Sequence, residues 1–165
     1  MVDQKAIYQN IINLLDQNQA EYKLFRHRPA LTYEDLAVIQ KEAGFIGTEG
    51  KCLVLKADND FIVYVTVQGK KVNFDQIKNL LNIKKVRLVL PKELMENFGA
   101  EPGCAYPFGF DSKCKIYLDP IIYDQEWFLF SPLYPDKTIQ ITGNSLKTVF
   151  QNLPNPVTET KDFNI

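Results

Sequence analysis

Two neighbouring runs of strand-forming residues give the strongest structural signal in this chain. Cys52–Leu55 and Phe61–Val67 are rich in β-branched and aromatic side chains, and the turn residues Asp58-Asn59-Asp60 lie between them. Runs of this kind joined by a short polar turn are typical of a β-hairpin. We therefore predict an antiparallel strand pair here, and a chain that contains such a pair does not form a purely parallel sheet.

The rest of the chain alternates between helical and strand patterns. Apolar residues with helical spacing follow the N-cap residues Asp3, Thr32 and Asn73, so a helix is predicted after each of them. Pro91 fits the first turn of another short helix, which ends at Gly99. Further strands are predicted at 22–25, 86–90, 114–118, 127–130 and 138–142, with a last helix at about 145–150.

These elements predict a single α+β domain, residues 1–152, in which helices surround a mixed, curved β-sheet. A chain of 165 residues can bury roughly 70% of its unfolded surface, so it needs neither disulfides nor a metal to fold. The segment 153–165 carries Pro154 and Pro156 and is expected to be a weakly ordered tail.

The scarcity of histidine limits the chemistry that the chain can carry. His27 is the only histidine, which excludes any site that needs two imidazoles, including the common zinc centres. We expect His27 itself to be a solvated loop residue. Cys52, Cys104 and Cys114 form no Cys-x-x-Cys pair, and their odd number suits reduced thiols. Cys52 and Cys114 fall in strand-like runs and are expected to be small core residues.

The charges of the chain are nearly balanced. The chain has nineteen Lys and Arg residues and twenty Asp and Glu residues, which gives a formal net charge of -1. Domains that hold nucleic acid by bulk charge are usually basic, so this mode of binding is disfavoured, and only a local basic groove remains open. No stretch reaches the roughly 18 apolar residues of a membrane span, and the N-terminal segment has no signal-peptide pattern. We expect a cytoplasmic protein.

The segment 99–109 is the first candidate for a binding loop, because it is rich in glycine and proline. Glycines let the backbone approach a ligand closely, and backbone N–H groups in a stiff loop can orient an ester carbonyl or stabilise an oxyanion. The same composition also suits a plain surface connection. Lys51, at the start of the predicted hairpin, is a second candidate, because a lysine there can anchor a phosphate or simply be solvated.

Three motifs, Lys51–Lys56, Pro91–Leu94 and Glu101–Gly109, follow one another along the chain, and Ile116–Pro120 and Phe130–Leu133 come after them. In the order and spacing of these motifs the chain resembles the YbaK/prolyl-tRNA editing-domain family. The resemblance covers about residues 7–150. The family includes free-standing deacylases and the editing insertion of bacterial prolyl-tRNA synthetases.

The resemblance implies a trans-editing deacylase that hydrolyses the ester of a mischarged tRNA carrying Ala, Ser, Thr or Cys. A separate hydrolytic step is needed because the amino-acid pocket of a synthetase binds a slightly different amino acid only about 1–3 kcal/mol more weakly than the correct one. In family terms Lys51, Gly103 and Pro107 are the catalytic residues, with Lys51 at the 3′ end of the tRNA. The residues expected to bind the substrate are Thr48, Cys104, Ala105, Tyr106, Phe108 and Ser131.

The resemblance further implies no metal and no cofactor, with a ribose hydroxyl of the substrate helping to activate water. The implied partner is a mischarged tRNA, bound by its 3′ acceptor end, and an aminoacyl-tRNA synthetase is a further candidate partner. No oligomeric state follows from the sequence.

Two positions depart from the family pattern. Cys52 follows Lys51 where Thr, Asn or Ala is more usual, and Ser131 stands where alanine-specific relatives have a histidine. The segments 47–51 and 115–123 resemble more closely the relatives that clear Ser or Thr from tRNA. These departures leave open a second hypothesis, a catalytically silent module that binds the tRNA 3′ end or aminoacyl-adenosine.

Secondary roles can be suggested for other residues. A third hypothesis is a thiol enzyme or redox sensor centred on Cys104.

A basic track for the acceptor stem of the tRNA could use Lys70, Lys71, Lys84, Lys85 and Arg87. Aromatic residues that could stack a terminal base are Tyr33, Tyr106, Phe108 and Trp127. Exposed lysines more often only solvate a surface, and aromatic residues more often form a core, so both alternatives stay open.

Overall fold

The strands β2 (Thr48–Ala57) and β3 (Asp60–Val67) form the hairpin that the sequence predicts. The computed structural model that contains this pair describes residues 2–165. The antiparallel register runs from Gly50 opposite Val67 to Ala57 opposite Asp60. The carboxylate of Asp58, in the turn, accepts hydrogen bonds from two backbone N–H groups of the segment that leads into β4. The prediction of a hairpin is confirmed, and β2 begins four residues earlier than the sequence indicates.

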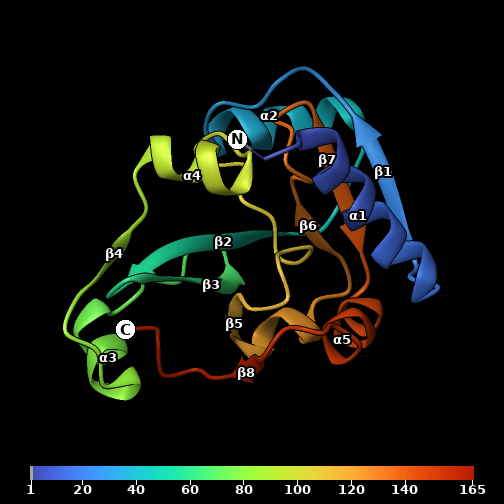
Figure 1. Cartoon of the computed structure of the whole chain (residues 1–165). Coiled ribbons are helices and arrows are strands. Elements are labelled where there is room, and N and C mark those ends of the chain that lie inside the picture. Colours follow the sequence, from blue (N-terminus) through green and yellow to red (C-terminus); the bar gives the residue numbers. More distant parts are fainter. Residues whose placement is uncertain (1) are drawn as a thin grey trace.

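Six more strands complete an eight-stranded mixed sheet within the described residues (Figure 1). They are β1 (Tyr22–Arg26), β4 (Val86–Leu88), β5 (Lys115–Leu118), β6 (Phe128–Phe130), β7 (Lys137–Ile141) and β8 (Val157–Glu159). The order is β1-β7-β6-β2-β3-β5-β8, and β4 pairs separately with β2. The pairs β2–β6, β3–β5 and β5–β8 are parallel and the others are antiparallel.

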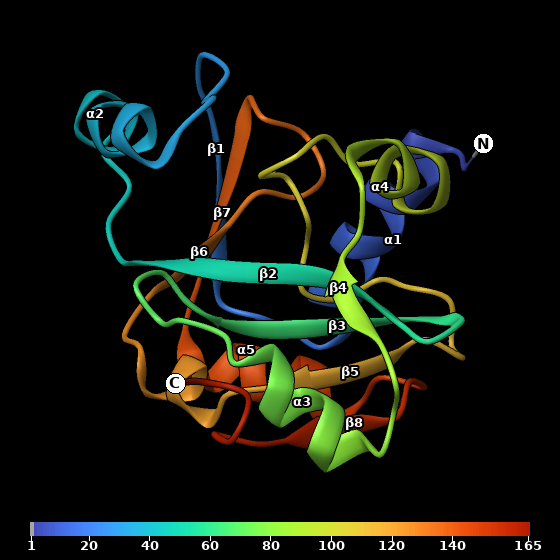
Figure 2. The same cartoon turned by 90° about the vertical axis from the view of Figure 1, so that its left-hand side faces the viewer.

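The sheet is strongly curved. β1 and β7 run across the direction of β2, β3 and β5 (Figure 2). Because β6 joins these two groups, side chains from both can pack into one shared core. The predicted α+β domain with a mixed, curved sheet is confirmed.

Helices cover both faces of this sheet (Figures 1 and 2). They are α1 (Gln4–Gln17), α2 (Tyr33–Ala43), α3 (Phe74–Leu81), α4 (Pro91–Phe98), α5 (Gly143–Gln151) and the short 3-10 helix η1 (Pro120–Asp124). The side chains of Asp3, Thr32 and Asn73 each accept a backbone N–H from the first turn of the helix that follows, so these predicted N-caps are confirmed. Within residues 2–165 no helix is both long and apolar enough to cross a membrane.

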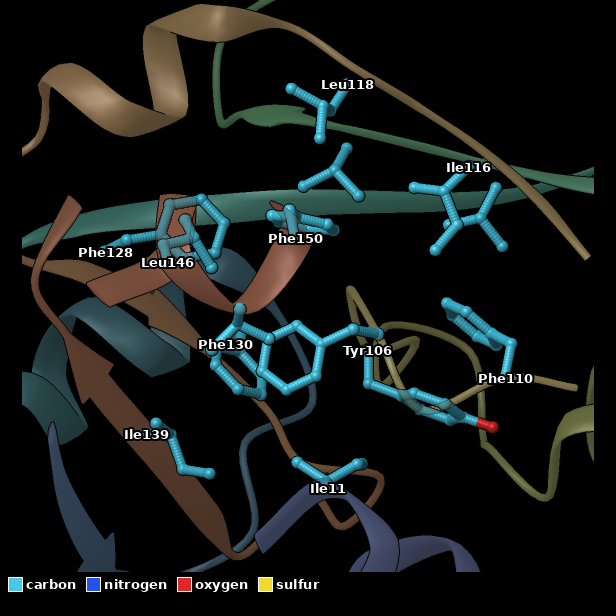
Figure 3. Close-up of a cluster of buried hydrophobic side chains, with 14 of the residues drawn as sticks. Ile11, Tyr106, Phe110, Ile116, Leu118, Phe128, Phe130, Ile139, Leu146 and Phe150 are labelled. Carbon is cyan, nitrogen blue, oxygen red and sulfur yellow. The ribbon is translucent and has the colours of Figure 1, made fainter. Parts of the chain in front are cut away.

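Most apolar side chains form one large core between the sheet and the helices α1, α4 and α5. Aromatic rings fill its centre (Figure 3). Phe108 packs edge-on against Phe130 and Phe150, with ring centroids 5.5 and 5.8 Å away. Tyr106 stacks on Phe110, with centroids 4.8 Å apart. Such offset and edge-to-face pairs stabilise a core beyond the area that they bury.

The segment 153–165 differs from the weakly ordered tail that the sequence predicts. It contains β8, which pairs in parallel with β5. Phe163 is buried and packs between the rings of Tyr64 and Tyr117, with centroids 5.1 and 5.0 Å away. The side chain of Asn164 accepts a hydrogen bond from the Tyr64 hydroxyl. These contacts all come from distant parts of the chain, so the local sequence gives little sign of them.

Candidate active site

The edge of β2 that faces away from β3 is only partly covered by other strands. On this edge β6 pairs with Thr48 and Glu49, and β4 pairs with Leu55–Ala57. Across residues 2–165 no strand pairs on that side with the stretch 50–53. The middle of the longest strand is therefore open to other segments of the chain.

A cavity of about 300 Å³ lies along this stretch. Its lining comes from β2, from the loop at 102–105, from the residues at the end of β6 and from the start of α2. The predicted site residues that line it are Lys51, Gly103, Cys104, Ala105 and Ser131. A cavity at the low end of the usual range of roughly 300–1,000 Å³ accepts a small ligand, so a macromolecule could insert only a terminal group.

Gly50 allows the floor of the cavity to lie directly on the core. The ring of Phe128 is fully buried beneath it. A Cβ atom at Gly50 would collide with that ring. Any larger residue would force the strand away from the core, because close-packed interiors have no room for an added carbon.

The loop that lines the cavity contains a tight turn with free backbone donors. The N–H of Cys104 donates to the carbonyl oxygen of Glu101 at 3.0 Å, and Gly103 has a φ of +86°. With Pro102 before it, Gly103 occupies the third position of a type II β-turn, where a positive φ favours glycine. The described residues offer no hydrogen-bond acceptor to the N–H groups of Gly103 and Ala105. Two backbone donors are therefore available to a ligand.

Lys51 supplies a positive charge at the cavity. Its ammonium Nζ donates a hydrogen bond to the backbone carbonyl oxygen of Lys70 at 2.7 Å. Within the described part of the chain no carboxylate lies within ion-pair distance of this ammonium. The charge is thus fixed in place by a neutral group and remains available to an anionic ligand.

Glu49 is a cavity residue that the sequence analysis does not single out. It lines the same cavity as Lys51, and its side chain is partly buried. Burial raises the pKa of its carboxyl group to about 8. The one sequence signal is its position two residues before Lys51, because such residues share a face of a regular strand.

The match between this chain and a known family covers residues 27–149, and that family is the aminoacyl-tRNA editing domain. The chain belongs to this family. The resemblance that the sequence motifs indicate is confirmed.

Two kinds of known protein are similar in sequence to this editing domain. A "Proline--tRNA ligase" of Bacillus velezensis is 34% identical over 88 residues, which are 51% of this chain and 16% of the ligase. The "Multifunctional Ser/Thr-tRNA deacylase ProXp-y" of Escherichia coli K12 is 24% identical over 129 residues, which are 76% of each chain. The match to this ligase and to that of Bacillus pumilus covers only 16% and 20% of their lengths.

A solved structure shows the same fold. The crystal structure of a candidate trans-editing enzyme for prolyl tRNA synthetase aligns with a TM-score of 0.69 and 16% identity. The alignment covers 93% of this chain and 95% of that one. At this level of identity the comparison establishes the architecture of the editing domain.

The thiols at the cavity of the editing domain are not activated. Burial, with smaller contributions from nearby carboxylates, raises the pKa of the Cys104 thiol to about 11. Burial also raises the pKa of Cys52, which packs against the main core. Reactive cysteines instead have lowered pKa values in electropositive surroundings. This environment argues against a thiol enzyme or redox sensor centred on Cys104.

Four predicted site residues do not line the cavity, namely Thr48, Tyr106, Pro107 and Phe108. The Thr48 hydroxyl donates to Oε1 of Gln125 at 2.6 Å. The Tyr106 hydroxyl donates to the carbonyl oxygen of Phe98 at 2.9 Å, inside the core. Both hydroxyls are therefore occupied by structural partners.

Tyr106, Pro107 and Phe108 are all buried, because the loop enters the aromatic core directly after Ala105. The ring of Tyr106 lies beside that of Phe110 in this core (Figure 3). The expectation that Tyr106 and Phe108 stack a terminal base is wrong for this reason. Of the other candidates for stacking, Tyr33 lines the cavity and is 48% exposed. Trp127 does not line it.

The predicted basic track is divided. Lys70 lies beside Lys51, at the open end of the hairpin. The backbone of Lys84 and Lys85 binds Asp58 at the opposite end, where the hairpin turns. The remaining two are Lys71, next to Lys70, and Arg87, which is bound by both carboxylate oxygens of Glu93 at 2.7 and 2.9 Å. These residues do not form one continuous surface with Lys51.

The only histidine lies outside the cavity and has a structural role. His27 directly follows β1, and its ring nitrogens lie 2.7 Å from the carbonyl oxygen of Arg28 and 2.8 Å from Oγ1 of Thr138. Its ring also packs against Phe45. His27 lies in a loop and is partly exposed, as expected, but it is not simply solvated, because two hydrogen bonds and a ring contact hold its side chain against the sheet.

Proposed function

We propose that this editing domain is a trans-acting deacylase that hydrolyses the ester of a mischarged tRNA carrying a small amino acid. The main support is that Lys51, Gly103 and Ala105 line one cavity. Within residues 2–165 the Lys51 ammonium has no carboxylate partner, and the N–H groups of Gly103 and Ala105 have no acceptor. An aminoacyl-tRNA offers matching groups, since anionic phosphates lie near an ester oxygen that becomes negatively charged during hydrolysis.

In the proposed reaction a water molecule attacks the ester carbonyl carbon. The N–H groups of Gly103 and Ala105 hold the oxyanion that forms, a contribution worth about 10²–10³-fold per donor in other enzymes. The bond from that carbon to the ribose oxygen then breaks and the free amino acid leaves. Lys51 holds the 3′ end of the tRNA so that the ester lies against the loop.

The loop at 102–105 itself carries no side-chain base for the water, and Glu49 on β2 is the one carboxyl group that lines the cavity. His27 lies elsewhere, and the pKa of the Cys104 thiol, raised to about 11 by burial, keeps it protonated at neutral pH. We infer that the neighbouring hydroxyl of the terminal ribose relays the proton from the water to the leaving ribose oxygen. An aminoacyl ester is already reactive, so positioning and oxyanion stabilisation can supply the remaining acceleration.

Among Ala, Ser, Thr and Cys we favour Ser and Thr as the amino acids removed. Ser131 lines the cavity and can place a hydroxyl beside a hydroxylated side chain. The E. coli relative is named as a Ser/Thr-tRNA deacylase, which supports the same class. The partner is then the 3′ acceptor end of a tRNA, and the similarity to proline–tRNA ligases makes a synthetase a further candidate partner.

The test is a deacylation panel with Ala-, Ser-, Thr- and Cys-tRNA, each compared with its rate without protein. We expect release of Ser and Thr well above that rate and slower release of Ala. Binding of these tRNAs without any release would favour the silent binding module instead. Absence of both binding and release would overturn the proposal.

A further inference from the structure

The cavity contains a single acidic side chain, Glu49, among the residues that line it. Across residues 2–165 the Glu49 carboxylate has no ion-pair or hydrogen-bond partner. Even Lys51, two residues away, directs its ammonium to the carbonyl oxygen of Lys70. A partly buried carboxylate without a partner lowers stability, so its position at a ligand cavity points to a partner that the ligand brings.

We propose that Glu49 binds the α-ammonium group of the aminoacyl ester, an inference that rests on the proposed deacylase function. Every aminoacyl-tRNA carries this cation one carbon away from the ester carbonyl. When the N–H groups of Gly103 and Ala105 hold the carbonyl oxygen, the ammonium must lie in the same small cavity. Glu49 is the one acidic residue that lines this cavity.

This assignment separates two kinds of selection. Glu49 recognises the part that all aminoacyl esters share, whereas Ser131 faces the variable side chain of the amino acid. Lys51 serves the anionic tRNA. Because an amide nitrogen carries no charge, esters of N-acylated amino acids lack the group that Glu49 binds. The editing domain should therefore act on aminoacyl-tRNA and discriminate against N-acylaminoacyl-tRNA.

The surroundings of Glu49 favour binding of a cation to its carboxyl group. Burial raises the pKa of Glu49 to about 8, so the group is easily protonated in the empty cavity. The titratable groups close to it are Tyr33 on α2 and Cys52 on β2, while the ammonium of Lys51, two residues away, is bound to the carbonyl oxygen of Lys70. The charge of Glu49 helps to raise the pKa of both Tyr33 and Cys52. An arriving ammonium would restore the ionised form of Glu49.

The test combines one protein change with one substrate change. Wild type and Glu49→Gln are each assayed with Ser-tRNA and with N-acetyl-Ser-tRNA. We expect wild type to prefer the free amine, and Glu49→Gln to lose about 10–100-fold in kcat/KM on Ser-tRNA alone, the usual range for a hydrogen bond to a charged group. Glu49→Asp should recover part of the loss. Glu126→Gln, at an exposed glutamate outside the cavity, is the matched control and should behave as wild type.

Each other outcome has a separate meaning. Equal losses on both substrates would overturn the inference and indicate that Glu49 acts as a base toward water. An unchanged preference for the free amine in Glu49→Gln would also overturn it. If wild type hydrolyses the ester of neither substrate, releasing neither serine nor N-acetylserine, the proposed deacylase function fails instead. Circular dichroism of Glu49→Gln shows whether the variant is folded, and the preference of wild type can be measured without any variant.

Discussion

The ammonium of Lys51 donates a hydrogen bond to the backbone carbonyl oxygen of Lys70, 2.7 Å away. This contact joins the floor of the cavity to the turn after β3, where Gly69 has a φ of +96°. It orients a long, flexible side chain without neutralising it. The positive charge at the cavity is therefore held in position before any ligand arrives, which lowers the entropy that binding must remove.

Replacing Lys51 tests the role of this charge. We expect Lys51→Ala to reduce kcat/KM for Ser-tRNA by about 10²-fold, because a positioned ionic contact to the substrate is lost. Its free energy of unfolding should change by no more than about 0.5 kcal/mol, as is usual for a surface substitution. The matched control is Lys56→Ala, since Lys56 lies on the same strand and also binds a backbone oxygen, that of Asn59. Equal losses in the two variants would show that Lys51 has no special role.

Replacing Gly103 tests the turn that frees the backbone donors. A Cβ atom at Gly103 meets no other atom, but its φ of +86° is strained for any other residue. Gly103→Ala should therefore cost about 1 kcal/mol of stability and shift the loop, with a loss of about 10–100-fold in deacylation. Gly44→Ala is the control, because Gly44 has a similar φ of +83° and equal free space at the end of α2. Comparable destabilisation with full activity in Gly44→Ala is expected, and loss of activity in both would contradict a specific role for the loop.

Replacing Cys104 tests whether a thiol takes part. The Cys104 thiol is buried, and burial raises its pKa to about 11. Cys104→Ala should keep deacylation within about threefold of wild type, while the small cavity it leaves costs about 1 kcal/mol in a denaturant titration. A complete loss of turnover in a folded Cys104→Ala protein would restore the thiol-enzyme hypothesis.

The pH dependence of stability tests the burial of Glu49. Its pKa is raised from an ordinary value of 4.5 to about 8. Between these values the folded protein holds a proton that the unfolded chain has released, so this group lowers stability as the pH rises from about 4.5 to about 8. Glu49→Gln cannot ionise and should match wild type near pH 4 but exceed it by on the order of 1–3 kcal/mol near pH 8. Urea titrations of both proteins measure the difference, and a difference that does not vary with pH would contradict the burial of this carboxyl.

Local patterns in the sequence predict the main elements of the fold. The hairpin at β2 and β3 follows from two β-rich runs around a polar turn, and the first three helices follow from N-cap residues whose side chains do accept backbone N–H groups. These signals depend on neighbours within a few residues. The tail at 153–165 could not be predicted in this way, because Phe163 is held by Tyr64 and Tyr117, which are far away in sequence.

The candidate site, like the fold, could be predicted from the sequence only in part. The family motif places Lys51 and Gly103 in one cavity, although they are distant in sequence. It does not reveal where the loop leaves that cavity, so Tyr106 is expected at the ligand and instead donates to a core carbonyl group. Glu49 is missed because an isolated glutamate near the start of a strand usually lies in water, and only the three-dimensional structure shows that it lines the cavity without a partner.

The most direct test of the central claim is single-turnover deacylation of Ser-tRNA with the protein in excess. The reaction is followed as release of labelled serine, with wild type, Lys51→Ala and no protein in parallel. Hydrolysis at this cavity predicts release by wild type at least about 10²-fold faster than without protein, and a return close to the uncatalysed rate in Lys51→Ala. Wild-type release no faster than the uncatalysed rate, or equal release by the two proteins, would contradict it.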